Sequence, residues 1–330
     1  MKKLLRLRPD VLIVALVAAA VIASFLPASG RTGAWLNVFT QASVALIFFL
    51  HGARLLPRIV LTGFANWRLH LTILACSFGL FPLLALPLNA LVPASLSPDL
   101  YVGFVFLCIL PSTIQSSIAF TSIAGGNVPA AVCAASASNM LGVVATPVLA
   151  MLLLGRQGGI DPHAIESVML QILAPFAAGQ ILERWIGGTI RAHRKLVGFA
   201  ERVSIIGVAY MAFSNAVIGG VWTQLNAEDL VAMLLLVVIL LAVVLMATRL
   251  VSRLLGFSRE DEIAIVFCGS KKSMGSGLPM ANIIFAGQAI GLIVLPMMVY
   301  HQIQLIVCAV LARAYAARTG SGTVTAAALE

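Results

Sequence analysis

Two adjacent lysines, Lys271 and Lys272, lie within an apolar stretch of the sequence. The stretch reads FCGSKKSMGSGLPMANIIF over residues 267–285 and adds three hydroxyl groups, those of Ser270, Ser273 and Ser276. A lysine inside a membrane costs about 2.5–3.5 kcal/mol on insertion scales and indicates a functional site. Ammonium and hydroxyl donors suit an anion or freed backbone carbonyls. Alternatively, a membrane span begins later and leaves the lysines at its mouth.

A second polar stretch, LCILPSTIQSSIAFTSIAGGN over residues 107–127, interrupts another apolar run. Serines in membrane helices often bond back to carbonyls of their own helix, and that interpretation stays open. The density of polar side chains beside a proline favours a binding role for Thr113, Gln115, Ser116, Ser117 and Asn127. Two further site candidates follow in the next span: Ser136, which is also compatible with helix packing, and Asn139, whose amide needs partners in hydrocarbon.

Glycine and proline in both stretches predict interrupted helices. Proline removes one helix hydrogen bond and clashes with the preceding turn, so the freed backbone groups must face protein or a water-filled cavity. The predicted helix breaks lie at Pro111, Gly269, Gly275, Gly277 and Pro279. Broken helices at matching places in two halves of a chain form the binding site of many secondary transporters.

Membrane helices are the elements that must position these groups. Of the 330 residues, 61% are hydrophobic and 10% are charged, whereas soluble domains carry about 25% charged residues. A spanning helix needs about 20 apolar residues. The sequence predicts ten spans, at residues 10–27, 35–51, 69–92, 99–125, 128–154, 165–185, 202–222, 228–252, 262–285 and 286–312.

Five spans in each half would insert the second half upside down. We therefore predict an all-α polytopic membrane protein built from two inverted five-helix repeats with discontinuous fourth and ninth helices. The predicted repeats are residues 1–155 and 156–315, and a flexible cytoplasmic tail follows at residues 316–330.

The net charge of +9 is explained by membrane topology rather than by nucleic-acid binding. With a cytoplasmic N-terminus, basic residues gather in or beside the inner loops, as the positive-inside bias requires. Lys271 and Lys272 are the two basic residues deep in a span that this topology does not explain. We predict a multi-pass protein of the bacterial inner membrane with both termini cytoplasmic, although the first residues could be a cleavable signal peptide. Expected partners are a small-molecule solute and the lipid bilayer, without nucleic acid, in a monomer or weak homodimer.

Motifs of membrane enzymes are missing from the sequence. It has neither an H-E-x-x-H helix nor a G-x-S-x-G elbow, and its five histidines are dispersed. A Ser270–Lys272 dyad is chemically conceivable. We predict a non-enzyme without a cofactor. It is either a secondary transporter or, as the alternative, a non-transporting or channel-like protein with a regulatory role in ion homeostasis or the cell envelope.

The stretches LPSTIQSSIAFTSIAGGN and FCGSKKSMGSGLPMA resemble the crossing discontinuous helices of the bile acid:sodium symporter superfamily. They are similar in particular to its divergent branch, with solute carrier family 10 member 7 and the bacterial YfeH-type transporters. The resemblance implies a panel domain of the first, second, sixth and seventh spans beside a core domain. It also implies that substrate binds between the two domains and that two sodium ions lie behind the crossing.

By that resemblance, the candidate sodium ligands are Ser116, Ser117 and Ser270. The acid that relatives carry at Ser270 or beside Lys271 is absent, and further ligand positions fall at Ala131, Ala135 and Met274. Two ammonium groups would repel a sodium ion. We hypothesise that one lysine ammonium fills the space of a sodium ion and pairs with Ser116, Ser117 and freed carbonyls. In a variant, coupling is to a proton on a buried lysine. The basic pair suggests a small anionic organic solute.

Overall fold

The computed structural model describes residues 11–54, 66–92, 96–155, 162–220, 226–286, 288 and 290–318. The regular elements in these ranges are all helices, with no strand among them. The last helix continues to Arg318, so the first residues of the predicted tail are helical. The rest of the tail lies outside the described residues, as do residues 1–10.

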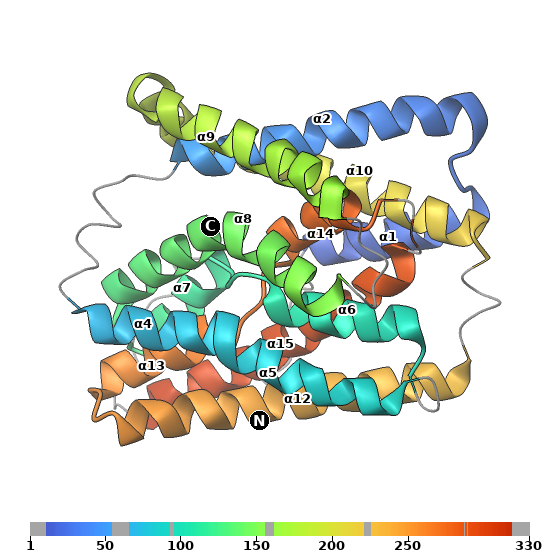
Figure 1. Ribbon diagram of the computed structural model, residues 1–330. Coiled ribbons are helices and arrows are strands. Elements are labelled where there is room, and N and C mark those ends of the chain that lie inside the picture. The colour runs from blue at the N-terminus through green and yellow to red at the C-terminus, as the bar shows by residue number, and fades with distance from the viewer. Residues whose placement is uncertain are drawn as a thin grey trace, which may run out of the picture.

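Figure 1 shows the helices in chain order from blue to red. The first half holds α1 (Val11–Phe25), α2 (Gly30–Arg54), α4 (Trp67–Ala75), the π-helical turn η2 (Cys76–Leu80), α5 (Phe81–Ala85), the 3-10 helix η3 (Leu86–Leu91), α6 (Pro98–Ile109), α7 (Gln115–Ile123) and α8 (Val128–Leu154). The second half holds α9 (Pro162–Ala192), α10 (Arg194–Ile218), α12 (Ala227–Leu254), α13 (Arg259–Gly269), α14 (Met274–Ile284) and α15 (Ile290–Arg318).

The helices form two layers. One layer consists of α1, α2, α9 and α10: α2 packs against α9 and α10, and α10 packs against α1. In Figure 1, α2 and α9 run along the upper side, with α10 and then α1 below them. Glycines bring α2 and α9 together, because a side chain at Gly52 would collide with the carbonyl of Phe176, and one at Gly179 with that of Phe49. Small residues allow such close approach between membrane helices. The remaining helices form the second layer, which meets the first through α8, α14 and α15.

Length and composition fit a protein that lies in a membrane. Six described segments are long and apolar enough to cross one: α2, Trp67–Leu91, α8, the greater part of α10, α12 and α15. Large apolar side chains of α12, such as Leu235 and Ile239, are exposed on the surface, where hydrocarbon tails would cover them. The predicted all-helical membrane fold is therefore confirmed.

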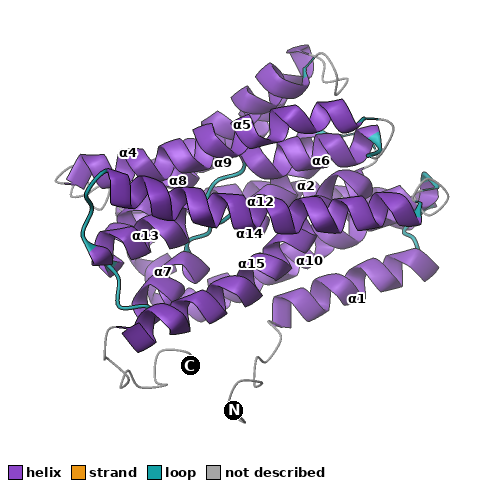
Figure 2. Cartoon of the chain, turned by 90° about the horizontal axis from the view of Figure 1, so that it is seen from below, coloured by secondary structure: helices purple, strands orange, loops and turns teal. Residues whose placement is uncertain are grey.

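Two helices of the second layer are interrupted. The predicted fourth span is divided into α6 and α7, and the predicted ninth span into α13 and α14. In Figure 2, α7 and α13 lie at one end of the molecule, while α6 and α14 lie nearer the other. Proline disfavours helical backbone in the residue before it, and α6 ends two residues before Pro111.

Candidate functional site

At the first helix break, residues 110–114, backbone carbonyls accept hydrogen bonds from side chains of α8. The last four carbonyls of a helix have no partner within it. The hydroxyl of Thr146 donates to the carbonyl of Ile109 at 2.9 Å, the end of α6. The amide of Asn139 donates to the carbonyl of Ser112 at 2.6 Å. Polar side chains of α8 thus satisfy backbone groups that the proline has freed.

The second break, residues 270–273, is held by α15. The Tyr300 hydroxyl donates to the carbonyl of Ser270 at 2.8 Å. The Gln304 side chain bonds twice to Lys272: its nitrogen donates to the backbone carbonyl at 3.1 Å, and its oxygen accepts from the backbone N–H at 3.2 Å. Tyr300 and Gln304 are both buried. The unwound segment therefore has the partners that buried backbone requires.

The two breaks touch each other. Backbone and serine hydrogen bonds join them: Ser273 N–H to the Pro111 carbonyl at 2.8 Å, the Ser112 hydroxyl to the Cys268 carbonyl at 2.6 Å, and the Ser117 hydroxyl to the Phe267 carbonyl at 3.1 Å. Both serine side chains that donate are fully buried. Because each interrupted helix supplies partners to the other, neither break can change its backbone path alone.

Lys272 extends across this contact into a group of carbonyl oxygens. Its Nζ donates to the carbonyls of Ser77, Cys108 and Leu110, each at 2.7 Å. These bonds use all three protons of the ammonium group. The centre of the Phe81 ring lies 4.0 Å from Nζ, and Lys272 is only 1% exposed. The hypothesis that a lysine pairs with freed carbonyls agrees with this geometry, but the serine hydroxyls expected beside it are not its partners.

Lys271 is buried equally, with 0% exposure, but its surroundings differ. Its Nζ lies 3.8 Å from the centre of the Phe120 ring, close enough for a cation–π interaction. Within the described part of the chain, Nζ has no hydrogen-bond partner. The thiols of Cys268 and Cys308 are near enough to interact with it electrostatically. The two lysines are adjacent in sequence, yet the Lys272 ammonium has three hydrogen-bond partners and the Lys271 ammonium has none among the described residues.

A cavity of about 30 Å³ lies between the two layers. Its polar lining comes from α2, α8 and α14, through His51, Ser136, Asn139 and Ser276. The Ser276 hydroxyl is buried, and no described residue forms a hydrogen bond with it. A space of this size holds about one water molecule. The fold thus brings Ser276 to the same cavity as Ser136 and Asn139, from which it is distant in sequence.

The hydroxyls of the candidate sodium ligands have partners within the protein. Ser270 donates its hydroxyl to the Val266 carbonyl of its own helix at 2.6 Å. The hydroxyls of Ser116 and Ser117 lie 2.7 and 3.1 Å from that of Thr113, so their oxygens serve one another. No group of three His, Cys, Asp or Glu side chains that could hold a metal occurs among the described residues. Hard cations prefer carboxylate and carbonyl oxygens, whereas the three candidate serines offer hydroxyls that bond to other protein groups.

Two predicted site residues, Asn127 and Gln115, do not line the cavity. Asn127 caps α8, since its side-chain oxygen accepts from Ala130 N–H at 3.0 Å and its nitrogen donates to Asp261 at 2.8 Å. Both ends of this amide are therefore engaged by protein. Gln115 is the first residue of α7 and is exposed. Neither side chain lines the cavity between the layers.

Three of the predicted break residues lie inside a helix. Pro111 falls in the first interruption and Gly269 ends α13, but Gly275, Gly277 and Pro279 are all within α14. The prediction that they break the helix is wrong. A membrane helix tolerates proline where its surroundings satisfy the freed carbonyl. Gly277 serves close packing instead, because a Cβ there would lie 2.6 Å from side-chain atoms of Leu110 and Met297.

Sequence reasoning missed several residues that hold the breaks. Ser138 accepts from Ser112 N–H at 3.0 Å, and Tyr300 and Gln304 support the second break. An amide within the apolar helix α15 was the available signal for Gln304, because such a group needs partners in hydrocarbon. The carbonyl of Ser77 carries no signal in residue type, since every residue has a carbonyl.

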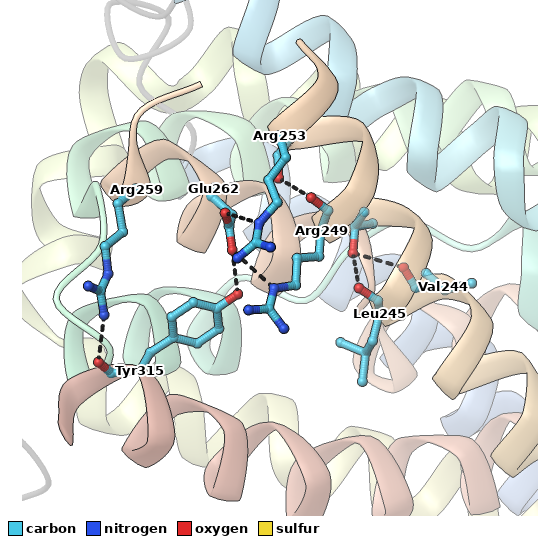
Figure 3. Close-up of polar contacts among 9 residues, drawn as sticks. Val244, Leu245, Arg249, Arg253, Arg259, Glu262 and Tyr315 are labelled. Carbon is cyan, nitrogen blue, oxygen red and sulfur yellow. Dashed lines mark hydrogen bonds and ion pairs between the residues drawn. The ribbon is translucent and has the colours of Figure 1, made fainter. Parts of the chain in front are cut away.

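A separate polar cluster ties α12, α13 and α15 together at one end of the second layer. Figure 3 shows Arg249, Arg253 and Tyr315 around the carboxylate of Glu262. Glu262 accepts from Arg253 at 3.0 Å and from the Tyr315 hydroxyl at 2.8 Å, and Arg249 lies 3.5 Å away. With Glu262 only 8% exposed, this cluster fixes the start of α13 and thus the approach to the second break.

Known proteins are similar to the chain over almost its full length. The SBF-like CPA transporter family matches residues 10–317. The chain is 48% identical over 315 residues to "Uncharacterized protein PA2026" of Pseudomonas aeruginosa, covering 95% of each. It is 44% identical over 305 residues to "Putative symporter YfeH" of Escherichia coli, covering 92% of each. It is 28% identical over 319 residues to "Sodium/bile acid cotransporter 7" of Rattus norvegicus, covering 94% of each.

Proposed function

The chain belongs to the SBF-like CPA transporter family, and from that premise we propose that it is a secondary active transporter of a small anionic organic solute in the bacterial inner membrane. Membership confirms the resemblance to the bile acid:sodium symporter superfamily and makes the chain a membrane transporter. The observation that carries the proposal is the contact of two broken helices beside a cavity between two layers.

The proposed architecture has ten spans in two inverted five-helix repeats, with both termini cytoplasmic. Its support is that each half contributes one broken helix, α6–α7 and α13–α14, and that α1, α2, α9 and α10 form one layer. These four helices would be the panel domain, and the other layer the core domain. Alternating access would then be a rocking of one layer against the other around the crossing.

The lining of the cavity supports a small polar solute. Neither lysine lines it, so the expected anion preference no longer rests on them. Instead, Ile114 and Ser276 line it at the amino ends of α7 and α14, where helix dipoles favour negative charge. Because the cavity has room for about one water molecule, a larger solute would bind only after the layers separate.

A proton, rather than sodium, is the coupling ion that we propose, with Lys271 as its carrier. An ammonium without hydrogen-bond partners is disfavoured in a buried site, and the Lys271 Nζ has only an aromatic face beside it in the described structure. Its ionisable neighbours are the thiols of Cys268 and Cys308. The next residue in the chain is the positively charged Lys272. These groups do not hold a proton on Lys271 as a carboxylate would.

Counterflow in proteoliposomes tests the transport function. Candidate compounds, small carboxylates and phosphates, are first selected as those that raise the unfolding temperature of the protein. Vesicles are then loaded with one unlabelled compound, and the same compound in labelled form is added outside. We expect saturable, trans-stimulated uptake of at least one anion. Ser276→Ala should reduce it, while Ser252→Ala, which removes a hydroxyl bonded to Arg249 in its own helix, should not. Non-saturating flux without counterflow would indicate a channel and contradict the proposal.

The coupling ion is tested by comparing exchange with accumulation. Lys271→Met should retain counterflow, because the solute cavity is intact, but lose accumulation driven by a pH gradient. If Lys271→Met still accumulates solute in response to pH, Lys271 is not the proton carrier.

A further inference from the structure

We infer that Lys272 is a built-in cation: its ammonium group permanently occupies a carbonyl cage and holds the two helix breaks together without a free metal ion. The carbonyl cage consists of the backbone oxygens of Ser77, Cys108 and Leu110, each 2.7 Å from Nζ. It is distinct from the solute cavity, so the inference stands or falls independently of what the protein transports.

The three oxygens are available because two separate segments, the end of α6 and the turn η2, end or deform at this point. Cys108 lies in the last turn of α6, where carbonyls lack helical partners, and Leu110 lies in the break itself. Ser77 belongs to the π-helical turn η2, an irregularity that is frequent at functional sites. Carbonyl oxygens that converge in this way carry partial negative charge and favour a cation between them, as in ion-selective filters.

The contacts indicate the charged ammonium rather than a neutral amine. A neutral amine has two protons to donate, whereas Nζ of Lys272 has three acceptors at hydrogen-bond distance. A separation of 2.7 Å is at the short end for N–H donors and is typical of charge-assisted bonds. The face of Phe81 at 4.0 Å adds a cation–π contact.

Lys272 and a free sodium ion would exclude each other from the carbonyl cage. Two positive charges confined to one small site repel each other. Because the ammonium group is covalently attached to the chain, its occupancy of the carbonyl cage does not depend on the concentration of any ion in solution. The crossing is therefore held at any sodium concentration, whereas a metal site would empty when sodium is removed.

Chemical rescue tests this role. Lys272→Ala removes Nζ with the three carbons that carry it, and n-propylammonium replaces those atoms. The compound is present from membrane extraction onward, and thermal unfolding is followed in lipid nanodiscs. We expect Lys272→Ala to unfold at least about 5 °C below the wild type, and n-propylammonium, but not 1-propanol, to restore part of that loss. Lys271→Ala, equally buried but outside the cage, should lose little and respond to neither compound.

A sodium titration of the wild type covers the case in which Lys272→Ala does not fold. At constant ionic strength, replacing choline with sodium should leave the unfolding midpoint of the wild type unchanged. A sodium-specific rise in that midpoint would overturn the inference. So would a Lys272→Ala protein as stable as Lys271→Ala, or one that 1-propanol rescues as well as n-propylammonium does.

Discussion

Both helix breaks are short interruptions of a helix, but only the second carries a positive charge. Residues 110–114 supply acceptors, since the carbonyls around Pro111 bind donors from α8 and from the second break. Residues 270–273 supply donors and carry the positive charge. The comparison teaches that the two halves repeat a backbone interruption without repeating its side chains. One break can then serve as the binding partner of the other.

A second contrast lies within residues 270–273. Lys272 donates three hydrogen bonds, and Lys271 donates none to the described residues. Burial alone does not separate them, because both are inaccessible to solvent. The partners of each ammonium distinguish the group that we infer to hold the crossing, Lys272, from the one that we propose as the proton carrier, Lys271. Substitutions at residues that bond across the two breaks should therefore reduce stability more than substitutions at matched residues that do not.

The largest difference is expected between Lys272→Met and Lys271→Met. Removing one member of a buried, charge-assisted contact costs about 3–5 kcal/mol, and Lys272→Met leaves three carbonyls without a donor. Lys271→Met removes an ammonium that lacks hydrogen-bond partners, so stability should be unchanged or higher. Thermal and urea unfolding in the same detergent measure both. Equal losses would remove the distinction between the two lysines.

The packing of α14 against the first break offers the next test. A side chain at Gly277 meets Leu110, whereas a Cβ at Gly275 comes no nearer than 3.7 Å to Ile205. Gly277→Leu should destabilise by about 3 kcal/mol through overpacking. Gly275→Ala should be neutral or stabilising by about 0.5–1 kcal/mol, because alanine favours helix. The reverse order of unfolding midpoints would contradict the packing described here.

Asn139 links the first break to the solute cavity. Asn139→Ala leaves the Ser112 carbonyl without its 2.6 Å donor, at a cost of about 1–3 kcal/mol for an unsatisfied buried group. It should also weaken solute binding, because the side chain lines the cavity. The control is Asn282→Ala, whose amide bonds to Leu278 in its own helix. An Asn139 variant with unchanged stability and uptake would contradict both roles.

Thr146→Val should have the smallest effect, about 1 kcal/mol, because it removes one neutral hydrogen bond to the end of α6. Thr248→Val is matched in size and burial, but its hydroxyl bonds to Val244 in its own helix. It should cost less, since the Val244 carbonyl is already part of the helical ladder. Unfolding midpoints of the two variants sharpen the comparison between tertiary and local bonds.

Sequence alone placed both interruptions and some of the site. Apolar runs define the helices because hydrocarbon permits little else, and Pro111 marks the first break. The prediction of a break at Pro279 is wrong because α14 accommodates this proline through packing that cannot be read from the sequence. Asn127 is a helix cap, a role that any asparagine near a helix start can take. The partners of Lys272 were not predictable, since backbone carbonyls have no residue type and their convergence on Lys272 depends on two segments distant from it in sequence.

The most direct test of the central claim is the initial rate of solute uptake by the wild-type protein in proteoliposomes, with external sodium replaced by choline at constant pH and ionic strength. The account predicts the same rate and the same accumulation in both solutions, because Lys272 supplies the cation at the crossing. Uptake that is lost without sodium and restored in a saturable manner by sodium would contradict it.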